Sequence, residues 1–396
     1  MKIAHILAQK PAATGSGIYI TETIRAFAAE GAEQALIAGI GPHEEYSFPD
    51  GLAFYPVIFE SEALPFPVVG MSDQMPYRAT RYCDMTPQMV SQFRAAFDKA
   101  LDSMLANFQP DLVICHHLYL LTAHVACREW PCPVQGVCHN TDLRQFQRID
   151  LEHDAIKRGI NRLDRVLALT SAQAETIVEL FDVDPEKITI IGTGYNDQVF
   201  FRDTSCVKRA HSLLYVGKTW RQKGVPNLMR AFDEVSREYP DAHLDLVGGY
   251  SNKDEYDSII AEAAQCAGDY RFCGVVSQAD LVDAYNRAEV FVLPSFSEGL
   301  PLVVLEALAC GCKVVLSDLP GLKDWLDSSA PDAPVLYVKP PRPGADSLAD
   351  EGDFERFERD LAQAIRTAFE LQVSGWSVRH LSWRAVCNIM KSNCDY

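Results

Sequence analysis

Short apolar runs alternate along this chain with longer stretches in which apolar residues recur every three or four positions. The short runs predict buried strands, and the longer stretches predict helices that cover them. Regular alternation of the two is typical of α/β folds built on parallel sheets. We expect strands at residues 2–7, 34–38, 52–58, 111–115, 133–138, 165–169, 187–191, 212–216, 243–247, 270–272, 291–294 and 313–317. We expect helices at residues 18–30, 88–108, 119–129, 143–163, 171–181, 225–239, 254–267, 278–288, 301–310, 354–370 and 377–391.

The alternation is interrupted by a polar stretch at residues 202–211, after which a fresh strand begins. A chain of 396 residues is long enough for two domains. We therefore expect two Rossmann-like α/β/α domains facing a cleft, at residues 1–204 and 205–375, and a terminal helical segment at 376–396. Residues 42–87 contain seven prolines and no sustained period, which predicts loops of the kind that often carry substrate specificity.

Residues 291–313, FVLPSFSEGLPLVVLEALACGCK, predict a strand, a loop, a helix beginning near Pro301 and a second strand. Glu306 is the only charged residue of that helix, and Glu298 lies eight positions earlier, on the loop. The unpaired backbone N–H groups at the start of such a helix attract an anion, and two carboxylates accept hydrogen bonds from hydroxyl groups. Phosphates together with many hydroxyls describe a nucleotide sugar. The alternative is a structural salt bridge for Glu306 and a solvated Glu298.

A second loop carries two lysines. The strand at residues 212–216 is followed by Gly217, and Lys218 and Lys223 come next on one short loop. Because the carboxyl ends of parallel strands lie along one edge of a sheet, we expect both lysines at the same edge as Glu298. Two cations beside a helix N-terminus would neutralise a diphosphate leaving group. The alternative is a pair of solvated surface lysines.

Two features of the first half could also contact a ligand. The loop after the first strand contains Gly15, Ser16 and Gly17, and glycines there let the backbone approach a phosphate or a sugar. His139 directly follows the strand at residues 133–138, which is where α/β sheets bind ligands. A plain tight turn and a core or capping histidine are the respective alternatives.

Composition narrows the class of protein. The net charge of −18 disfavours a nucleic-acid partner, because binding to phosphate backbones needs basic surface. No apolar run is long enough to cross a bilayer, and the amino terminus begins like a strand rather than a signal peptide. We therefore expect a cytoplasmic protein with at most peripheral contact with the inner face of the membrane.

The twelve cysteines are distributed as reduced core thiols would be. Residues 115–139 are rich in Cys and His, so a zinc site is conceivable, but paired CxxC or CxxH spacing is lacking and incidental thiols are the favoured interpretation. Basic residues between 144 and 165 alternate with acidic ones, which indicates a solvated face rather than a patch for a membrane or an acceptor.

Together these motifs resemble GT-B glycosyltransferases of the retaining family 4. The resemblance rests on SEGLPLVVLEALACG, in which Glu298 and Glu306 have the family's E-x7-E spacing, and on YVGKTWRQKG, PEKITIIGTGYNDQVF and DLVGG. It covers residues 187–317 strongly, and the first domain through the Gly15–Gly17 loop and His139. The end of the chain resembles the family's terminal helix, which crosses back onto the first domain.

The resemblance implies a site for a nucleotide sugar of the UDP or GDP type, with neither a cofactor nor a metal. It places the donor diphosphate against Gly15, Ser16, Gly17, Gly217, Lys218 and Lys223. It places the donor sugar against Glu298, Gly299, Leu300 and Pro301, and the ribose against Glu306. His139 would lie near the anomeric carbon and the acceptor, so His139, Glu298 and Lys223 are the expected catalytic residues. Lys218 stands where the family commonly has arginine, which keeps the charge but loses the bidentate fork.

The activity implied is that of a hexosyltransferase that moves a sugar, with retention, onto a hydroxyl of a glycan, a lipid-linked acceptor or a small molecule. Two alternatives share the fold: a phosphorylase or epimerase, and a carbohydrate-binding relative without activity. A nicotinamide-dependent dehydrogenase is disfavoured, because neither half has the three-glycine turn followed by an acidic residue about 20 positions later.

Overall fold

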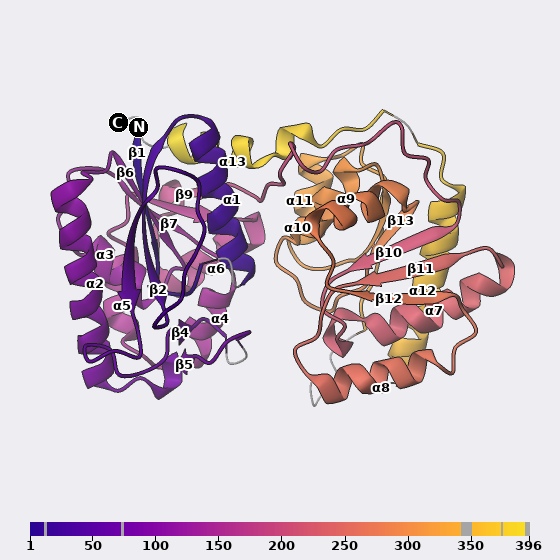
Figure 1. Cartoon of the computed structure of the whole chain (residues 1–396), viewed down its shortest axis with the longest axis horizontal. Helices are drawn as coiled ribbons and strands as arrows, with labels where there is room; N and C mark the ends of the chain where they lie inside the picture. Colours follow the sequence, from indigo (N-terminus) through magenta and orange to yellow (C-terminus); the bar gives the residue numbers. More distant parts are fainter. Residues whose placement is uncertain (12–13, 73–74, 342–350, 374, 393–396) are drawn as a thin grey trace. The chain divides into compact units, whose positions relative to one another are not determined.

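The computed structural model describes residues 1–396 except 12–13, 73–74, 342–350, 374 and 393–396. The chain divides into two compact units (Figure 1). The first is made of Met1–Gly192 together with Trp383–Tyr396, and the second of Thr193–Ser382. Each is an α/β unit with a parallel sheet, which confirms the predicted fold class.

The units divide at other residues than the expected 204 and 375, because the segments that flank these positions contact the second unit. The backbone N–H of Asp203 donates to Asn286 Oδ1 at 2.8 Å. The indole N–H of Trp376 donates to the carbonyl of Leu308 at 3.3 Å. Residues on either side of both expected boundaries therefore belong to one packed unit.

The first unit contains a seven-stranded parallel sheet in the order β3-β2-β1-β6-β7-β8-β9. Its strands are β1 (Lys2–Leu7), β2 (Glu33–Ile40), β3 (Ala53–Ile58), β6 (Leu112–His116), β7 (Val134–Val137), β8 (Arg165–Ala168) and β9 (Ile188–Ile190). Pro56 is tolerated in β3 because that strand lies at the edge of the sheet. A separate pair, β4 (Val69–Gly70) and β5 (Thr80–Arg81), lies in the proline-rich region.

Helices cover both faces of this sheet, and β1 shows why. Ile6 packs in the cluster that contains Phe93 and Phe97 of one helix, whereas the next residue, Leu7, packs with Ile20 and Ile24 of another. Successive side chains of a strand point to opposite faces, so one apolar strand serves two helical layers. The helices are α1 (Gly15–Ala29), α2 (Pro87–Asn107), α3 (Leu120–Ala126), α4 (Thr141–Arg148), α5 (His153–Ile160), α6 (Ser171–Phe181) and α13 (Trp383–Ser392).

The last helix, α13, packs on α1 of the first unit (Figure 1). The rings of Trp383 and Tyr19 meet edge to face with their centroids 4.7 Å apart. Arg384 and Lys391 both pair with Glu30 near the end of α1. Apolar and ionic contacts together attach the end of the chain to its beginning.

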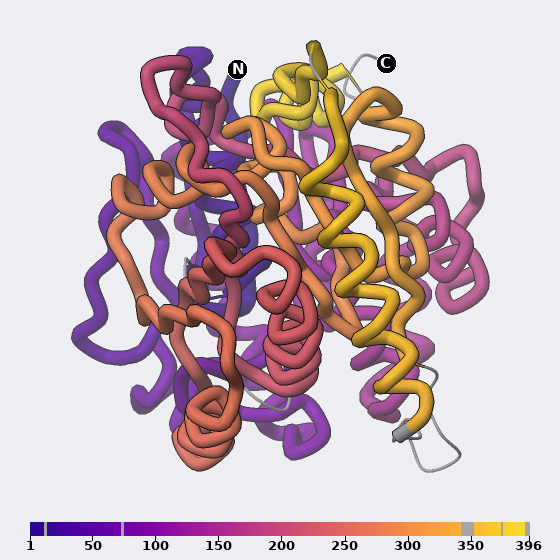
Figure 2. The backbone as a smooth tube through the Cα atoms, turned by 90° about the vertical axis from the view of Figure 1, so that its right-hand side faces the viewer, coloured from indigo at the N-terminus to yellow at the C-terminus, as the bar shows by residue number. Residues whose placement is uncertain are grey.

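The second unit contains a six-stranded parallel sheet in the order β12-β11-β10-β13-β14-β15. The strands are β10 (Ser212–Val216), β11 (His243–Val247), β12 (Tyr270–Gly274), β13 (Val290–Leu293), β14 (Lys313–Ser317) and β15 (Val335–Val338). The helices are α7 (Val225–Glu238), α8 (Lys253–Ala263), α9 (Gln278–Arg287), α10 (Leu302–Ala309), α11 (Leu322–Ser329) and α12 (Glu351–Glu370). The long α12 lies along α7 and against β14 and β15 (Figure 2).

Several predicted helices differ from the structure, and the one expected at 377–391 begins only at Trp383. The helix expected at 143–163 is two short ones, α4 and α5, because Glu152 adopts φ of +49° and its carboxylate binds Arg94 of α2. The helix expected from residue 18 begins three residues earlier, because Thr14 caps it by accepting the N–H of Gly17 at 3.1 Å. The short elements α11 and β15 were not predicted. None of the helices in the described part of the chain combines the length and apolar character needed to cross a bilayer.

Candidate functional site

Two loops at the carboxyl edge of the second sheet are packed against each other. One follows β10 and contains the short 3-10 helix η3 (Arg221–Lys223), and the other follows the neighbouring β13. The N–H of Phe296 donates to the carbonyl of Gln222 at 3.0 Å. Gly224 has φ of +70°, and a Cβ there would lie 2.2 Å from the carbonyl oxygen of Pro294. Only glycine allows the two loops to approach this closely.

This contact brings two of the predicted residues together. Lys223 Nζ lies 2.6 Å from Glu298 Oε1, in an ion pair whose side chains are 24% and 14% exposed. The charge of Glu298 also contributes, after burial, to raising the pKa of Tyr215 well above its ordinary value. A lysine and a carboxylate that are largely withdrawn from water, 75 positions apart in sequence, therefore form the centre of this edge of the sheet.

Glu306 lies within α10, which ends at Ala309 and is followed by Gly311 with φ of +82°, as predicted for a helix stop. The carboxylate is half-buried. Its Oε2 accepts a hydrogen bond from the hydroxyl of Tyr285 at 3.1 Å. Burial, and secondarily the charge of Glu306, raise the pKa of Tyr285 far above its ordinary value, so the hydroxyl remains a donor. Tyr285, on α9, holds the carboxylate in one orientation, a role that no sequence pattern indicated.

Replacing Tyr285 with phenylalanine is expected to keep the packing of this fully buried ring while removing the donor to Glu306. The affinity for UDP or GDP, the nucleotides that the family resemblance implies, should fall by roughly tenfold, the size of one net hydrogen bond to a charged group. Tyr337→Phe removes a similar hydroxyl, which donates to Asp327 at 2.9 Å, and serves as the control. Calorimetric titration measures both, and equal losses in the two variants would contradict a specific role for Tyr285.

The remaining predicted residues of this unit lie around the same two loops. Lys218 is exposed, and its carbonyl accepts the hydroxyl of Tyr215 at 2.7 Å. The N–H of Gly217 donates to Val247 O at 2.9 Å, so this glycine lies beside the end of β11. Gly299 is exposed with open space around it, Leu300 is buried, and Pro301 precedes the first residue of α10. The second unit therefore collects all of its predicted residues at the carboxyl edge of its sheet.

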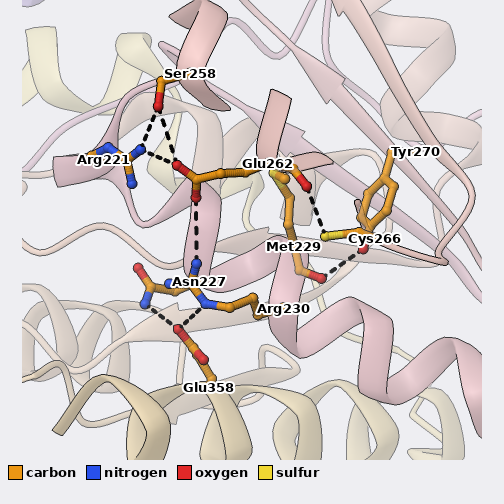
Figure 3. Close-up of polar contacts among 9 residues, drawn as sticks. All are labelled: Arg221, Asn227, Met229, Arg230, Ser258, Glu262, Cys266, Tyr270 and Glu358. Carbon is orange, nitrogen blue, oxygen red and sulfur yellow. Dashed lines mark hydrogen bonds and ion pairs between the residues drawn. The ribbon is translucent and has the colours of Figure 1, made fainter. Parts of the chain in front are cut away.

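Residues that the sequence did not single out anchor the loop that carries Lys223 (Figure 3). Arg221, two residues earlier, donates to Ser258 Oγ at 3.0 Å and pairs with Glu262, both on α8. Arg230 of α7 bridges Glu262, at 3.7 Å, and Glu358 of α12, at 2.7 Å. Charged side chains on α7, α8 and α12 thus form a network that holds η3 through Arg221, and Lys223 extends from the end of η3.

The predicted residues of the first unit also lie close to one another. His139 Nε2 is 3.1 Å from Nδ1 of His116, at the end of the neighbouring β6. His117 Nε2 lies 3.1 Å from Gln9 Oε1, which accepts the hydroxyl of Ser16 at 3.3 Å. Gly15, Ser16 and Gly17 form the first turn of α1 rather than a loop. A polar network therefore connects the amino end of α1 to the end of β7.

Asp142 holds this arrangement in place. The carboxylate is fully buried and accepts the backbone N–H groups of Leu118, at 2.7 Å, and of His139, at 3.1 Å. Burial raises the pKa of Asp142, and these two hydrogen bonds oppose the rise. The loops after β6 and β7 are thereby fixed to each other. In the sequence, the position of Asp142 three residues after His139 was the only indication of this role.

Residues 115–139 contain the Cys and His side chains that made a zinc site conceivable. Within the part of the chain that the structure describes, no three or more His, Cys, Asp or Glu side chains are arranged to hold a metal ion. Cys115, Cys127 and Cys138 are thiols outside any disulfide. His116 and His117 of this region belong instead to the network around His139.

Comparison with known proteins matches each half of the chain to a family model of glycosyltransferases. Residues 13–199 match the family model Glycosyltransferase Family 4, and residues 210–352 match the model Glycosyl transferases group 1. A D-inositol 3-phosphate glycosyltransferase of Thermobispora bispora is 28% identical over 292 residues, which cover 67% of each chain. In two further relatives of that name the match covers 61% and 40% of the relative's length.

Solved structures have the same fold over almost the whole chain. Sucrose-phosphate synthase of Thermosynechococcus elongatus matches with a TM-score of 0.65 and 19% identity, covering 99% of this chain and 98% of its own. The HepE protein of Anabaena, solved in complex with UDP, matches with a TM-score of 0.62 and 12% identity, covering 99% of both chains.

Proposed function

The chain belongs to the glycosyltransferases of family 4 and group 1, and on that premise we propose that it moves a hexosyl group from a UDP- or GDP-sugar to a hydroxyl of an acceptor with retention of configuration. The observation that carries this proposal is the Lys223–Glu298 pair, 2.6 Å across, on the loop that leads into α10. A cation and an acceptor of hydroxyl hydrogen bonds stand side by side there. A sugar diphosphate needs both at the junction of its sugar and its phosphates.

Each group in the second unit has a part in holding the donor. Lys223 and the exposed Lys218 compensate the charge of the diphosphate, together with the backbone N–H groups at the amino end of α10. Glu298 accepts hydrogen bonds from hydroxyls of the donor sugar. Glu306, oriented by Tyr285, accepts those of the ribose. Lys223 can serve both partners, since an ammonium group has three donors and Glu298 occupies one.

The proposed reaction is a front-face displacement. The bond between the anomeric carbon and the phosphate oxygen breaks, and its electron pair stays on the leaving diphosphate, where Lys218 and Lys223 stabilise it. The acceptor oxygen bonds to the anomeric carbon on the same face, and its proton goes to the phosphate oxygen. In the first unit we assign His139 to the acceptor side and the amino end of α1 to the phosphates, as the family resemblance implies. Protein cations thus do the work that a divalent metal does in other transferases.

Product stereochemistry and chelation test this proposal. The protein is incubated with α-linked UDP- and GDP-hexoses, and with D-inositol 3-phosphate as the first acceptor, because the Thermobispora relative is named for it. We expect α-linked product by proton NMR and an unchanged initial rate in excess EDTA. A β-linked product would contradict retention, and a rate abolished by EDTA and restored by Mg²⁺ would contradict charge compensation by lysine. Inorganic phosphate as the preferred acceptor would indicate a phosphorylase.

A further inference from the structure

Four histidines lie at or near the carboxyl edge of the first sheet, and their ring nitrogens are unequally paired. His5, His116 and His117 are fully or almost fully buried, whereas His139 is half-buried. In each of the three buried rings one nitrogen has a polar partner. The other nitrogen (Nδ1 of His5, Nε2 of His116 and Nδ1 of His117) is buried and has no hydrogen-bond partner among the described residues. Such a nitrogen should be a bare lone pair, because an orphaned buried N–H costs more.

His5 shows that this rule holds where it can be checked independently. The side-chain amide of Gln34 is oriented by its Nε2, which donates to the carbonyl of Ile24 at 2.9 Å. Its Oε1 therefore faces His5 Nε2, at 3.0 Å, and can only accept. The proton of His5 is accordingly on Nε2, and the unpaired Nδ1 is the lone pair. An independent contact thus assigns the proton to the nitrogen that has a partner.

The pair formed by His116 and His139 can be assigned in the same way. The ring planes of His116 and His139 are inclined by 19° with their centroids 5.4 Å apart. His116 Nδ1 and His139 Nε2 are 3.1 Å apart, so the two nitrogens share a single proton. If that proton belonged to His139, neutral His116 would carry its own on Nε2, which is buried without a partner. If it belongs to His116, the second proton is on Nδ1 of His139, which is not among the buried unpartnered atoms. The second arrangement avoids an unsatisfied buried donor, worth about 1–3 kcal/mol.

We propose that His116 is a positioning residue that donates from Nδ1 to His139 Nε2, and thereby holds His139 neutral with its proton on Nδ1. His139 then presents a fixed N–H donor to an oxygen atom of a bound sugar or acceptor, and is neither a cation nor a base there. This use of the donor rests on the proposed transferase function, whereas the position of the proton does not. His116 thereby determines which ring nitrogen of His139 carries the proton.

The surroundings of His139 agree with a neutral ring. Burial lowers the pKa of His139 to about 3 and that of His116 far below its ordinary value, and the positive charge of His139 would lower the latter further. The groups that face His139 are the rings of Tyr19, at 5.1 Å between centroids, of His117, at 4.7 Å, and of His116. The carboxylate of Asp142 accepts the backbone N–H of His139. Among the described residues, no carboxylate forms an ion pair with the His139 ring, so no such pair favours the imidazolium.

Long-range proton–nitrogen NMR of the full chain, labelled with 15N-histidine, tests this assignment at neutral pH. His139 is identified by the signal lost in His139→Phe, and we expect it as the Nδ1–H tautomer. In His116→Phe a ring still fills the space but the N–H donor is lost, so the tautomer of His139 should change to mostly Nε2–H. His116→Gln restores a side-chain N–H donor and should restore the Nδ1–H tautomer. His5→Phe is the matched control, because His5 is bonded to Gln34 and should leave His139 unchanged.

Two results would overturn the proposal: an Nε2–H tautomer of His139 in the wild-type chain, or an unchanged Nδ1–H population in His116→Phe. The wild-type spectrum decides even if a variant fails to fold. Transfer kinetics are a second readout, in which kcat/KM should fall roughly tenfold in His116→Phe and recover in His116→Gln. Absence of any transfer activity in the wild type with the predicted tautomer present would contradict the proposed function and leave the assignment of the proton standing.

Discussion

Lys223→Met is expected to lower kcat/KM for sugar transfer by about 100-fold, the loss typical when one preorganised group that stabilises transition-state charge is removed. Two effects combine at this position. The leaving diphosphate loses a cation, and Glu298, whose side chain is only 14% exposed, loses its partner at 2.6 Å. Both kcat and the apparent donor affinity should therefore fall. Initial rates of nucleoside diphosphate release over a range of donor concentrations separate the two.

Lys323→Met provides the matched control for this variant. Lys323 pairs with Asp327 within α11 rather than with a residue of either loop, so its loss should leave kcat/KM unchanged. Thermal unfolding of both variants verifies that the fold is intact. A Lys223→Met variant that is folded and transfers sugar at the wild-type rate would remove the diphosphate role assigned to this lysine.

Glu306→Gln is expected to weaken the binding of UDP or GDP by about 10–100-fold, since hydrogen bonds to a charged acceptor contribute about 1.5–3 kcal/mol each. Glutamine keeps the size of the side chain and can still accept from Tyr285, so the loss reports the charge rather than the packing. The main effect should be on the dissociation constant of the nucleotide rather than on kcat at saturating donor. Isothermal titration calorimetry measures it directly.

Glu289→Gln is the comparison for Glu306→Gln. Glu289 is likewise half-buried, but it pairs with Lys313 at 3.0 Å and lies before β13, at the opposite edge of the sheet. The Glu289→Gln substitution should leave the affinity for the nucleotide unchanged even if it lowers the stability of the fold. Combining Glu306→Gln with Tyr285→Phe should cost less than the sum of the single changes, because the two side chains act through one hydrogen bond. Full additivity would mean that the two residues act separately.

The arrangement of elements around Glu306 could be predicted from the sequence because several local signals agree there. The apolar run of β13, Gly311 after the helix and the apolar run of β14 all indicate one strand–helix–strand unit. The position of the two lysines at the carboxyl edge followed from the parallel arrangement expected of the strands, and the structure adds that β10 and β13 are neighbours. The structure confirms the placement of both loops at that edge.

Direct side-chain contacts could not be predicted in this way. The partner of Lys223 lies 75 positions away, and a sequence pattern gives the sheet edge but not the direction of a side chain. The hydroxyl of Tyr285 reaches Glu306 from a helix that the pattern treats as an ordinary cover of the sheet. His116 was noted only as one of several possible metal ligands, because its pairing with His139 depends on the register of β6 against β7.

One secondary-structure error came from a tertiary contact. The break between α4 and α5 depends on Glu152 in a left-handed conformation, stabilised by Arg94 from a helix 58 positions earlier. Residues 141–160 have a helical period on both sides of this break, so the period alone predicts one long helix. Tertiary contacts, rather than local propensity, determined the outcome.

The central claim is that the amino end of α10, with Lys223, Glu298 and Glu306, holds the donor nucleotide. A crystal structure of the chain with UDP or GDP bound tests it most directly. The account predicts a diphosphate within hydrogen-bonding distance of Lys223 Nζ and of the first turn of α10, and a ribose on the carboxylate of Glu306. A nucleotide bound elsewhere, with the Lys223–Glu298 pair left without contact to it, would contradict the account.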